Sequence, residues 1–190
     1  VSVDKLEEIE VTNKMKYATS GKCGDNLTWS YGSGVLTISG TGAMYDYPVY
    51  DTPSSSQCMP WYNYKSAITT VNIAEGVTTI GACAFWGCSS LTSVTTPATI
   101  STIGFGAFCD CSGLQQVTIK AGFVGESAFI RCTALRTVTV GSGVTGFGIS
   151  AFENCPGLTG VYISDLAAWC RIDFGGYLSN PLYGAKRLYL

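Results

Sequence analysis

Cysteine, histidine and the carboxylic acids are the residue types most able to do chemistry, and their numbers here already restrict it. The 190-residue chain has nine Cys, 13 Asp and Glu, 11 Lys and Arg, and no His. Without His, the commonest general base and metal ligand is missing, and so is the usual base of Ser and Cys triads. A net charge of −2 gives no electrostatic reason to bind nucleic acid. We therefore expect no cofactor and no nucleic-acid partner.

Four of the cysteines share one position of an internal repeat: Cys88, Cys111, Cys132 and Cys155. If the repeats stack, these side chains form a ladder with a spacing of about 5 Å, one strand spacing. A metal array is one interpretation. A structural ladder is the favoured one, because Cys fills a tight internal turn well. We predict no zinc site, since the chain has neither His nor a C-x-x-C pair.

The other five cysteines leave the disulfide question open. They are Cys23, Cys58, Cys83, Cys109 and Cys170, and an odd total of nine means that at least one cysteine is unpaired within the chain. A bridge between Cys23 and Cys58 would tie down the N-terminal flank. A bridge between Cys83 and Cys109 would join neighbouring repeats.

A pair of carboxylates would be the basis of an enzyme that hydrolyses sugars. The repeats contain Glu75, Asp110, Glu126 and Glu153, which stand at −10, +2, −3 and +1 relative to the nearest repeat Phe. These different offsets predict that the four carboxylates are scattered around the molecule as solvated charges. The sequence therefore favours a protein that is not an enzyme.

The elements that position these residues come from the repeat itself, A-F-x-x-C-x-x-L-x-x-V-x-[IV], which is followed by V-x-x-I-G in its better copies. Its Phe residues are at 85, 108, 129 and 152, in steps of 23, 21 and 23. The apolar alternation after the Leu predicts a short strand, and the segment from Phe to Leu a short helical or 3₁₀ turn. A Gly precedes each A-F pair, where we expect the chain to bend sharply. Units this short bury their apolar faces only by stacking, with parallel strands.

A degenerate earlier copy begins near Trp61, and subtraction of 23 puts Tyr62 at its Phe position and Lys65 at its Cys position. The Phe129 copy departs from the pattern, because it lacks two residues before Gly125 and has Gly122-Phe123-Val124 in place of V-x-x-I. We expect a local change of curvature there.

The A-F-x-x-C-x-x-L-x-x-V-x-I copies resemble the BspA-like (treponemal-type) leucine-rich repeats of bacterial surface proteins, closely over residues 61–163. The resemblance implies export, display on the cell surface or secretion, and a role in adhesion or protein binding. The fold expected is a mainly-β solenoid. It is a right-handed leucine-rich-repeat stack of 21–23-residue rungs with short helical or 3₁₀ turns and an N-terminal β-hairpin cap.

We divide the chain into residues 1–20, a linker or added strand; 21–60, an N-terminal β cap and aromatic loop; 61–163, about five rungs; and 164–190, an atypical C-terminal rung or cap. A hairpin turn is predicted at Gly32-Ser33-Gly34. A short helix is predicted to begin after an N-cap at Ser164 or Asp165 and to run through Cys170. Leu188-Tyr189-Leu190 matches Val161-Tyr162-Ile163 and predicts a sixth rung. The apolar end suggests part of a longer surface protein. No 18-residue apolar segment is present, so we expect no membrane span in this chain.

Two surfaces are candidates for binding a protein or a surface glycan. The first is the outward strand face, an uncharged and hydroxyl-rich surface comprising Thr70, Asn72, Ser93, Thr95, Gln116, Thr118, Thr137, Thr139 and Tyr162. The second is the aromatic loop, comprising Tyr45, Tyr47, Tyr50, Trp61 and Tyr62. The strand face favours a non-catalytic protein-binding or adhesion module. The alternatives are a structural spacer that displays another domain, and a carbohydrate-binding module that uses the aromatic loop.

Overall fold

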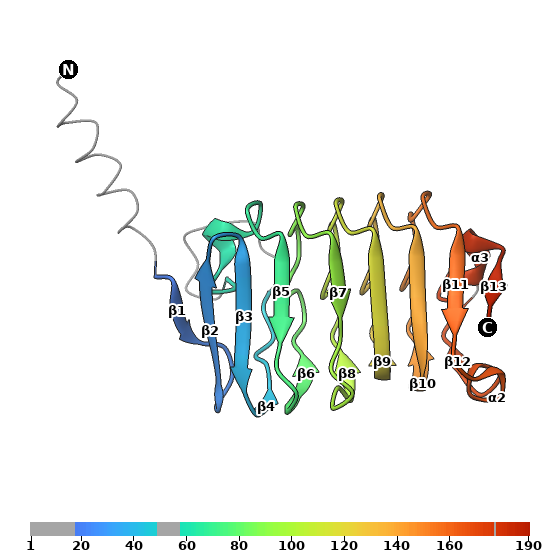
Figure 1. Ribbon diagram of the computed structural model, residues 1–190, viewed down its shortest axis with the longest axis horizontal. Coiled ribbons are helices and arrows are strands. Elements are labelled where there is room, and N and C mark those ends of the chain that lie inside the picture. The colour runs from blue at the N-terminus through green and yellow to red at the C-terminus, as the bar shows by residue number, and fades with distance from the viewer. Residues whose placement is uncertain (1–17, 49–57, 177) are drawn as a thin grey trace, which may run out of the picture.

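The computed structural model describes residues 18–48, 58–176 and 178–190, which form a β-solenoid (Figure 1). The predicted solenoid of stacked repeats is therefore confirmed. One wall, which we call the front sheet, is antiparallel from β1 to β3 and parallel from β3 onward. Its strands in spatial order are β1 (Ser20–Lys22), β2 (Leu27–Gly32), β3 (Val35–Gly40), β5 (Thr70–Ile73), β7 (Ser93–Thr95), β9 (Gln116–Val124), β10 (Thr137–Phe147), β11 (Gly160–Ile163) and β13 (Leu188–Tyr189).

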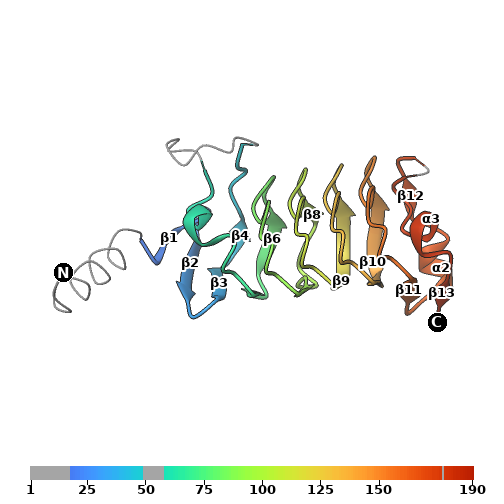
Figure 2. The same ribbon diagram turned by 90° about the horizontal axis from the view of Figure 1, so that it is seen from above.

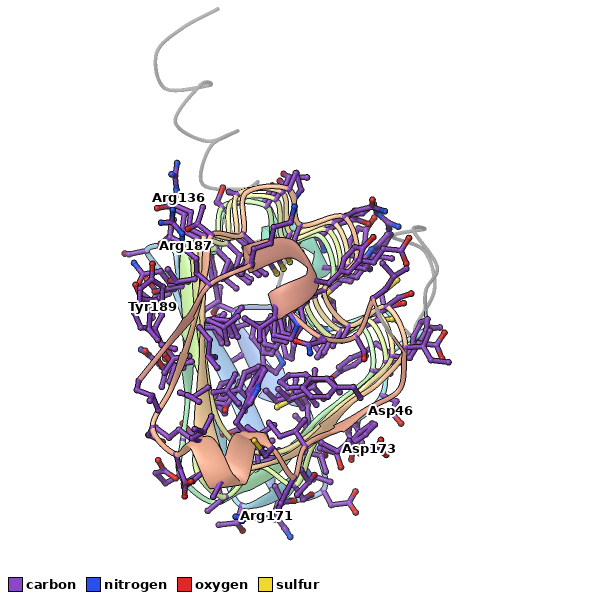
Figure 3. The ribbon with its side chains drawn as sticks, turned by 90° about the vertical axis from the view of Figure 1, so that its right-hand side faces the viewer. Asp46, Arg136, Arg171, Asp173, Arg187 and Tyr189 are labelled. Carbon is purple, nitrogen blue, oxygen red and sulfur yellow. The ribbon has the colours of Figure 1, made fainter. Side chains whose placement is uncertain are left out.

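A second wall, the rear sheet, is built from the V-x-x-I-G segments, for which the sequence predicted no strand. It contains β4 (Gly42–Ala43), β6 (Val77–Ile80), β8 (Thr102–Ile103), the second halves of β9 and β10, and β12 (Asp173–Phe174). The long strands β9 and β10 pass from one wall to the other. Along the axis, the two walls enclose the apolar side chains of the core (Figure 3).

The segment from Phe to Leu forms the third side of each repeat and is a set of turns rather than a helix. Its backbone N–H groups donate alternately to the next repeat and to the same repeat. The N–H of Phe85 donates to the carbonyl of Ala107 in the next repeat at 2.8 Å, and the N–H of Cys88 donates back to Phe85 at 3.2 Å. Backbone hydrogen bonds therefore join neighbouring repeats along this third side of the solenoid as well. Figure 2 shows the regular stacking of the repeats from above. Among the described residues of the first repeat, a single 3₁₀ turn, η1 (Tyr62–Tyr64), is present.

A column of stacked aromatic rings runs along the core. Phe85, Phe108, Phe129 and Phe152 follow one another at ring-centroid distances of 5.0, 5.1 and 5.3 Å, with their planes within 15° of parallel. Trp61 extends this column, 5.7 Å from Phe85, and its indole N–H donates to the Ala84 carbonyl at 2.8 Å. The prediction that Tyr62 occupies the Phe position was wrong by one residue. The spacing at this end is 24, because the larger indole takes the buried place.

The glycine before each A-F pair is required by close packing rather than by a sharp bend. A Cβ on Gly104 would lie 2.6 Å from the backbone N of Ala82, and one on Gly125 would lie 2.7 Å from the Ile103 carbonyl. The left-handed backbone occurs two residues later, at Cys83, Gly106, Ser127 and Ser150, with φ between 53° and 58°. The predicted bend therefore exists, but at a different residue, and the glycine lets neighbouring repeats approach.

The short Phe129 repeat is accommodated at the corner between the two walls. Strand β9 has nine residues where β10 has 11, and their pairing shifts register between Val140 and Gly143 and again between Val144 and Gly146. The two missing residues are thus absorbed by bulges in the neighbouring strand. Both walls continue through this point without interruption.

The flanks complete the front sheet at both ends. The predicted turn joins β2 to β3 through Ser33 and Gly34, which both have positive φ and so favour a tight hairpin. At the other end, Asp165 accepts a bond from the Ala168 N–H at 2.9 Å and caps α2 (Leu166–Trp169), as predicted. After α3 (Leu182–Ala185), β13 pairs with β11 in the predicted 27-residue register. Most of the predicted N-terminal linker, residues 1–17, lies outside the described residues.

The aromatic column predicts a large difference between two Phe residues of the same repeat. Phe108→Ala should lower the free energy of unfolding by about 3–5 kcal/mol, because the ring is fully buried and leaves a cavity between two stacked rings. Phe105→Ala should cost less than about 1 kcal/mol, because this ring is 46% exposed. Urea unfolding of both variants measures the difference; equal losses would contradict the column's role.

Close approach of the repeats predicts that Gly125→Ala destabilises the protein by about 3 kcal/mol, because the new methyl group would meet the Ile103 carbonyl. Gly32→Ala is the matched control, since a Cβ there would meet no atom within 4 Å. Thermal unfolding followed by circular dichroism gives both values. A Gly125 variant as stable as the Gly32 variant would disprove the packing argument.

Candidate functional site

The predicted strand-face residues lie together on the outer surface of the front sheet. Parallel register places Thr70, Ser93, Gln116 and Thr137 side by side in one row. Thr95, Thr118, Thr139 and Tyr162 form the next row, and Asn72 occupies the same position on β5. Their side chains point away from the core because the residues between them, such as Val94 and Val117, are buried. Adjacent strands thus present one continuous face with hydroxyl and amide groups.

The structure adds two residues to these rows that the prediction did not include. In the register of β13, Tyr189 lies beside Tyr162, and Arg187, one residue before Leu188, lies beside Gly160. The sequence carried a signal for both, since the 27-residue match between 161–163 and 188–190 implies these neighbours. The outward rows therefore end in an aromatic and a cationic side chain.

The aromatic loop is not one surface, and two of its predicted contact residues require correction. Trp61 is fully buried in the aromatic column, and Tyr47 is 8% exposed with its ring edge-on to Trp61 at 5.8 Å. Both therefore belong to the core. Tyr45 is 44% exposed, and its hydroxyl donates to Asp25 at 2.9 Å. Tyr50 lies outside the described residues.

Tyr62, the last predicted member of the loop, is half-buried on the turn side. The ammonium group of Lys65 lies 4.2 Å from the centre of its ring and 4.9 Å from that of Trp86. This cation–π arrangement holds Tyr62 against its own repeat. A pocket of about 650 Å³ nearby is lined by Tyr45, Tyr47 and others, but Tyr62 is not among its lining residues. The predicted aromatic residues are thus divided between the core, this pocket and the turn side.

The four repeat cysteines lie in one buried column beside the aromatic rings. Each thiol from the second onward bonds to the preceding repeat: Cys111 to the Phe85 carbonyl at 3.1 Å, Cys132 to Phe108 at 3.2 Å and Cys155 to Phe129 at 3.1 Å. Burial raises the pKa of Cys88 and of Cys155 to about 12, and that of Cys111 and Cys132 well above the usual value. The column therefore holds neutral thiols that satisfy backbone carbonyls.

Cys23, Cys83 and Cys109, which the two candidate bridges require, are free thiols in the structure. Neither of the two bridges left open by the sequence is present. Cys109 instead contacts Asp110 at 3.4 Å and the guanidinium of Arg131 at 3.2 Å. Burial, and then the bond to Asp110, raise the pKa of the Cys109 thiol to about 12.

Two of the four repeat carboxylates come together, contrary to the predicted scatter. Asp110 and Glu153 line one pocket of about 680 Å³ between the turns and α3, together with Arg131, Phe152 and Tyr183. Their offsets from Phe differ by one residue, and stacking of the repeats places them on the same side. Asp110 is held by Arg131 at 2.6 Å and by the indole N–H of Trp86 at 3.0 Å. The bond from Arg131 lowers the pKa of Asp110 to about 2, so this carboxylate is a fixed anion.

The other two repeat carboxylates lie apart from this pocket. Glu75 pairs with Lys120 at 3.6 Å, and Glu126 is exposed at the end of the rear sheet. Within residues 18–48, 58–176 and 178–190, no three side chains of the metal-binding types form a ligand set. Likewise, none of the helices described in these ranges is long and apolar enough to cross a membrane.

Comparisons with known proteins agree with this geometry. Residues 60–169 match the family described as BspA type leucine rich repeat region, in six copies. The chain is similar in structure to a leucine-rich repeat protein from Eubacterium ventriosum, with a TM-score of 0.60 and 27% identity over 77% of this chain and 44% of that one. It thus spans less than half of that relative's length.

Two further solved structures resemble the chain more loosely. One is a leucine rich repeat protein from T. pallidum, with 17% identity, a TM-score of 0.49 and 81% of each chain covered. The other is a leucine rich cell surface protein from Faecalibacterium prausnitzii, with 24% identity, a TM-score of 0.43, and 78% of this chain and 46% of that one covered. No curated protein matches the chain.

Burial of the cysteine column predicts strong differences in thiol labelling. At pH 8 the exposed Cys170 should react with maleimide within minutes, whereas Cys88, Cys111, Cys132 and Cys155 should react at least about 100-fold more slowly in the folded protein. The raised pKa values keep these four thiols protonated, and burial blocks the reagent. Peptide mass spectrometry after timed labelling, with unfolded protein as the control, measures each site. Column cysteines that label as fast as Cys170 would contradict the assignment.

Proposed function

Because the chain belongs to the BspA-type leucine-rich repeat family, we propose that it is a non-catalytic module, displayed on a cell surface or secreted, that binds a protein partner in adhesion. The front sheet is the proposed binding surface. The family match and the leucine-rich repeat fold support a role in protein interaction. We also propose that the chain acts as part of a longer surface protein.

One observation carries this proposal: two outward rows of the front face are continuous, and from β5 to β10 these rows bear no charge. Their residues there are Thr, Asn, Ser and Gln, all with groups that donate or accept hydrogen bonds. The exposed Lys120, two residues beyond Thr118 on β9, lies outside these rows and pairs with Glu75. Solenoids typically bind partners on such extended surfaces. The rigid backbone beneath, bonded from repeat to repeat, keeps the side chains in fixed positions, which lowers the entropy cost of binding.

The alternatives have less support from the geometry. A carbohydrate-binding site on the aromatic loop would need exposed ring faces, but Trp61 and Tyr47 are in the core. A structural spacer would bind nothing on either sheet. An enzyme would need a titratable pair, whereas Asp110 is already engaged by Arg131 and Trp86.

The front-face proposal predicts that two substitutions in the middle of the face weaken binding strongly. Thr95→Arg and Gln116→Arg should each weaken binding to a partner at least tenfold, because a long charged side chain would hold the partner off a flat surface. Thr78→Arg and Thr145→Arg are the controls, since both side chains are exposed on the rear sheet, and they should change the affinity less than twofold. Biolayer interferometry against a panel of purified extracellular host and bacterial proteins, with a glycan array in parallel, provides the measurement.

Binding that the rear-sheet variants reduce as much as the front-face variants would overturn the proposed surface. Glycan binding lost on Tyr45→Ala would favour the carbohydrate-binding alternative. If no protein and no glycan binds the folded wild-type chain, the spacer alternative stands.

A further inference from the structure

The front face ends in a patch whose chemistry differs from that of its middle. Four exposed residues make up this terminal patch: Arg136, Tyr162, Arg187 and Tyr189. Tyr162 and Tyr189 continue the row of Thr139, and Arg187 continues the row of Thr137. In the view along the axis, Arg136, Arg187 and Tyr189 lie on the same side of the molecule (Figure 3).

The two tyrosines of the patch form a fixed aromatic pair. Their ring centroids are 4.7 Å apart with planes 14° from parallel, and the residues are 41% and 39% exposed. Both rings lean over Gly160, where a Cβ would lie 3.0 Å from the Tyr189 ring and 3.4 Å from the Tyr162 ring. The equivalent residues of the preceding strands are Thr, Ser and Gln, so the loss of a side chain at this one position makes room for the pair.

The charge around this pair is positive and is not neutralised by the protein. Among the described residues, no ion pair joins Arg136, Arg187 or the neighbouring Lys186 to a carboxylate. The outward rows from β5 to β13 contain no Asp or Glu. Asp46 and Asp173 lie on the opposite side of the molecule in Figure 3. The guanidinium groups are therefore available for anions, which they can hold through two parallel bonds each.

From this arrangement we infer that the terminal patch anchors an acidic segment of a protein partner. Partner carboxylates would bind Arg136 and Arg187, and an apolar or aromatic side chain would pack on Tyr162 and Tyr189. This inference rests on the proposed function and names the chemistry of its partner. Tyr and Arg are among the residue types that most often dominate the energy of protein interfaces.

An acidic polypeptide fits the patch better than an anionic polysaccharide does. The two rings stack on each other, so each covers one face of its neighbour. A sugar chain that bound by stacking would use several open aromatic faces, whereas a single apolar side chain needs only the edge and the outer face of the pair. The remaining length of a protein segment would then lie along the uncharged hydroxyl rows.

A selection from a random 12-residue peptide display library tests the inference and requires no candidate partner. Peptides selected on the wild-type protein should be enriched in Asp and Glu and should bind at least tenfold more weakly to Tyr162→Ala/Tyr189→Ala. Selection on Arg136→Glu/Arg187→Glu should reverse the enrichment, toward Lys and Arg. The control Lys22→Glu/Arg171→Glu removes two exposed cations outside the patch and should leave the selected peptides unchanged. Raising the salt from 50 to 500 mM should weaken binding about tenfold.

Several results would overturn the inference. One is selected peptides without acidic enrichment, and another is acidic peptides that bind the control variant as weakly as the patch variants. Heparin bound through Arg136 and Arg187, with no peptide enriched, would replace the acidic segment by a polysaccharide. Thr95→Arg and Gln116→Arg could instead abolish the binding of peptides or proteins that the patch variants still bind. That result would support the front face as the binding surface and disprove only the acidic anchor at the terminal patch. Circular dichroism of each variant confirms that it is folded.

Discussion

Everything else in this structure depends on the agreement between two spacings. Aromatic rings stack along the core at 5.0–5.3 Å from Phe85 to Phe152, and parallel strands in the walls lie about 4.8 Å apart. A repeat fits only if its ring and its backbone advance together, which brings neighbouring backbones into contact at Gly104 and Gly125. The column of Cys thiols runs beside these rings, and from Cys111 onward each thiol bonds to a backbone carbonyl of the preceding repeat. A difference in length between neighbouring repeats must therefore be accommodated at the corner between the walls, as the bulges of β10 show.

The repeat could be predicted from the sequence because each of its constraints recurs at a fixed spacing. Phe, Cys and Leu mark buried positions four times over, so their burial and the strand that follows were readable without a structure. The rear sheet was missed because its strands are as short as the two residues of β8, too short to show an alternating pattern. The exchange of Tyr62 for Trp61 was missed because spacing alone does not reveal which of two neighbouring aromatic side chains is buried. The shared pocket of Asp110 and Glu153 depends on how repeats of 21 and 23 residues superpose in space.

The division between core and surface also explains where distinct chemistry occurs. Inside, every repeat must satisfy the same geometry, so its residues are nearly the same from one repeat to the next. Outside, the front rows are not bound by that geometry, yet they stay neutral and polar through β10. They change from Gly160 and Tyr162 of β11 onward, and the step from β11 to β13 is 27 residues instead of 23. The terminal patch forms where β13 is supplied by a segment that does not carry the repeat pattern.

The bonds between repeats have a consequence for a protein under tension. Backbone bonds such as that from Phe85 to Ala107 run along the axis of the solenoid. A force along this axis would load these bonds in the direction in which they open, so we expect neighbouring repeats to separate one at a time. Each layer that opens releases about 23 residues, a contour of roughly 75 Å at about 3.3 Å per residue, in exchange for one strand spacing. We therefore expect the stack to lengthen in steps of one repeat when it is pulled along its axis.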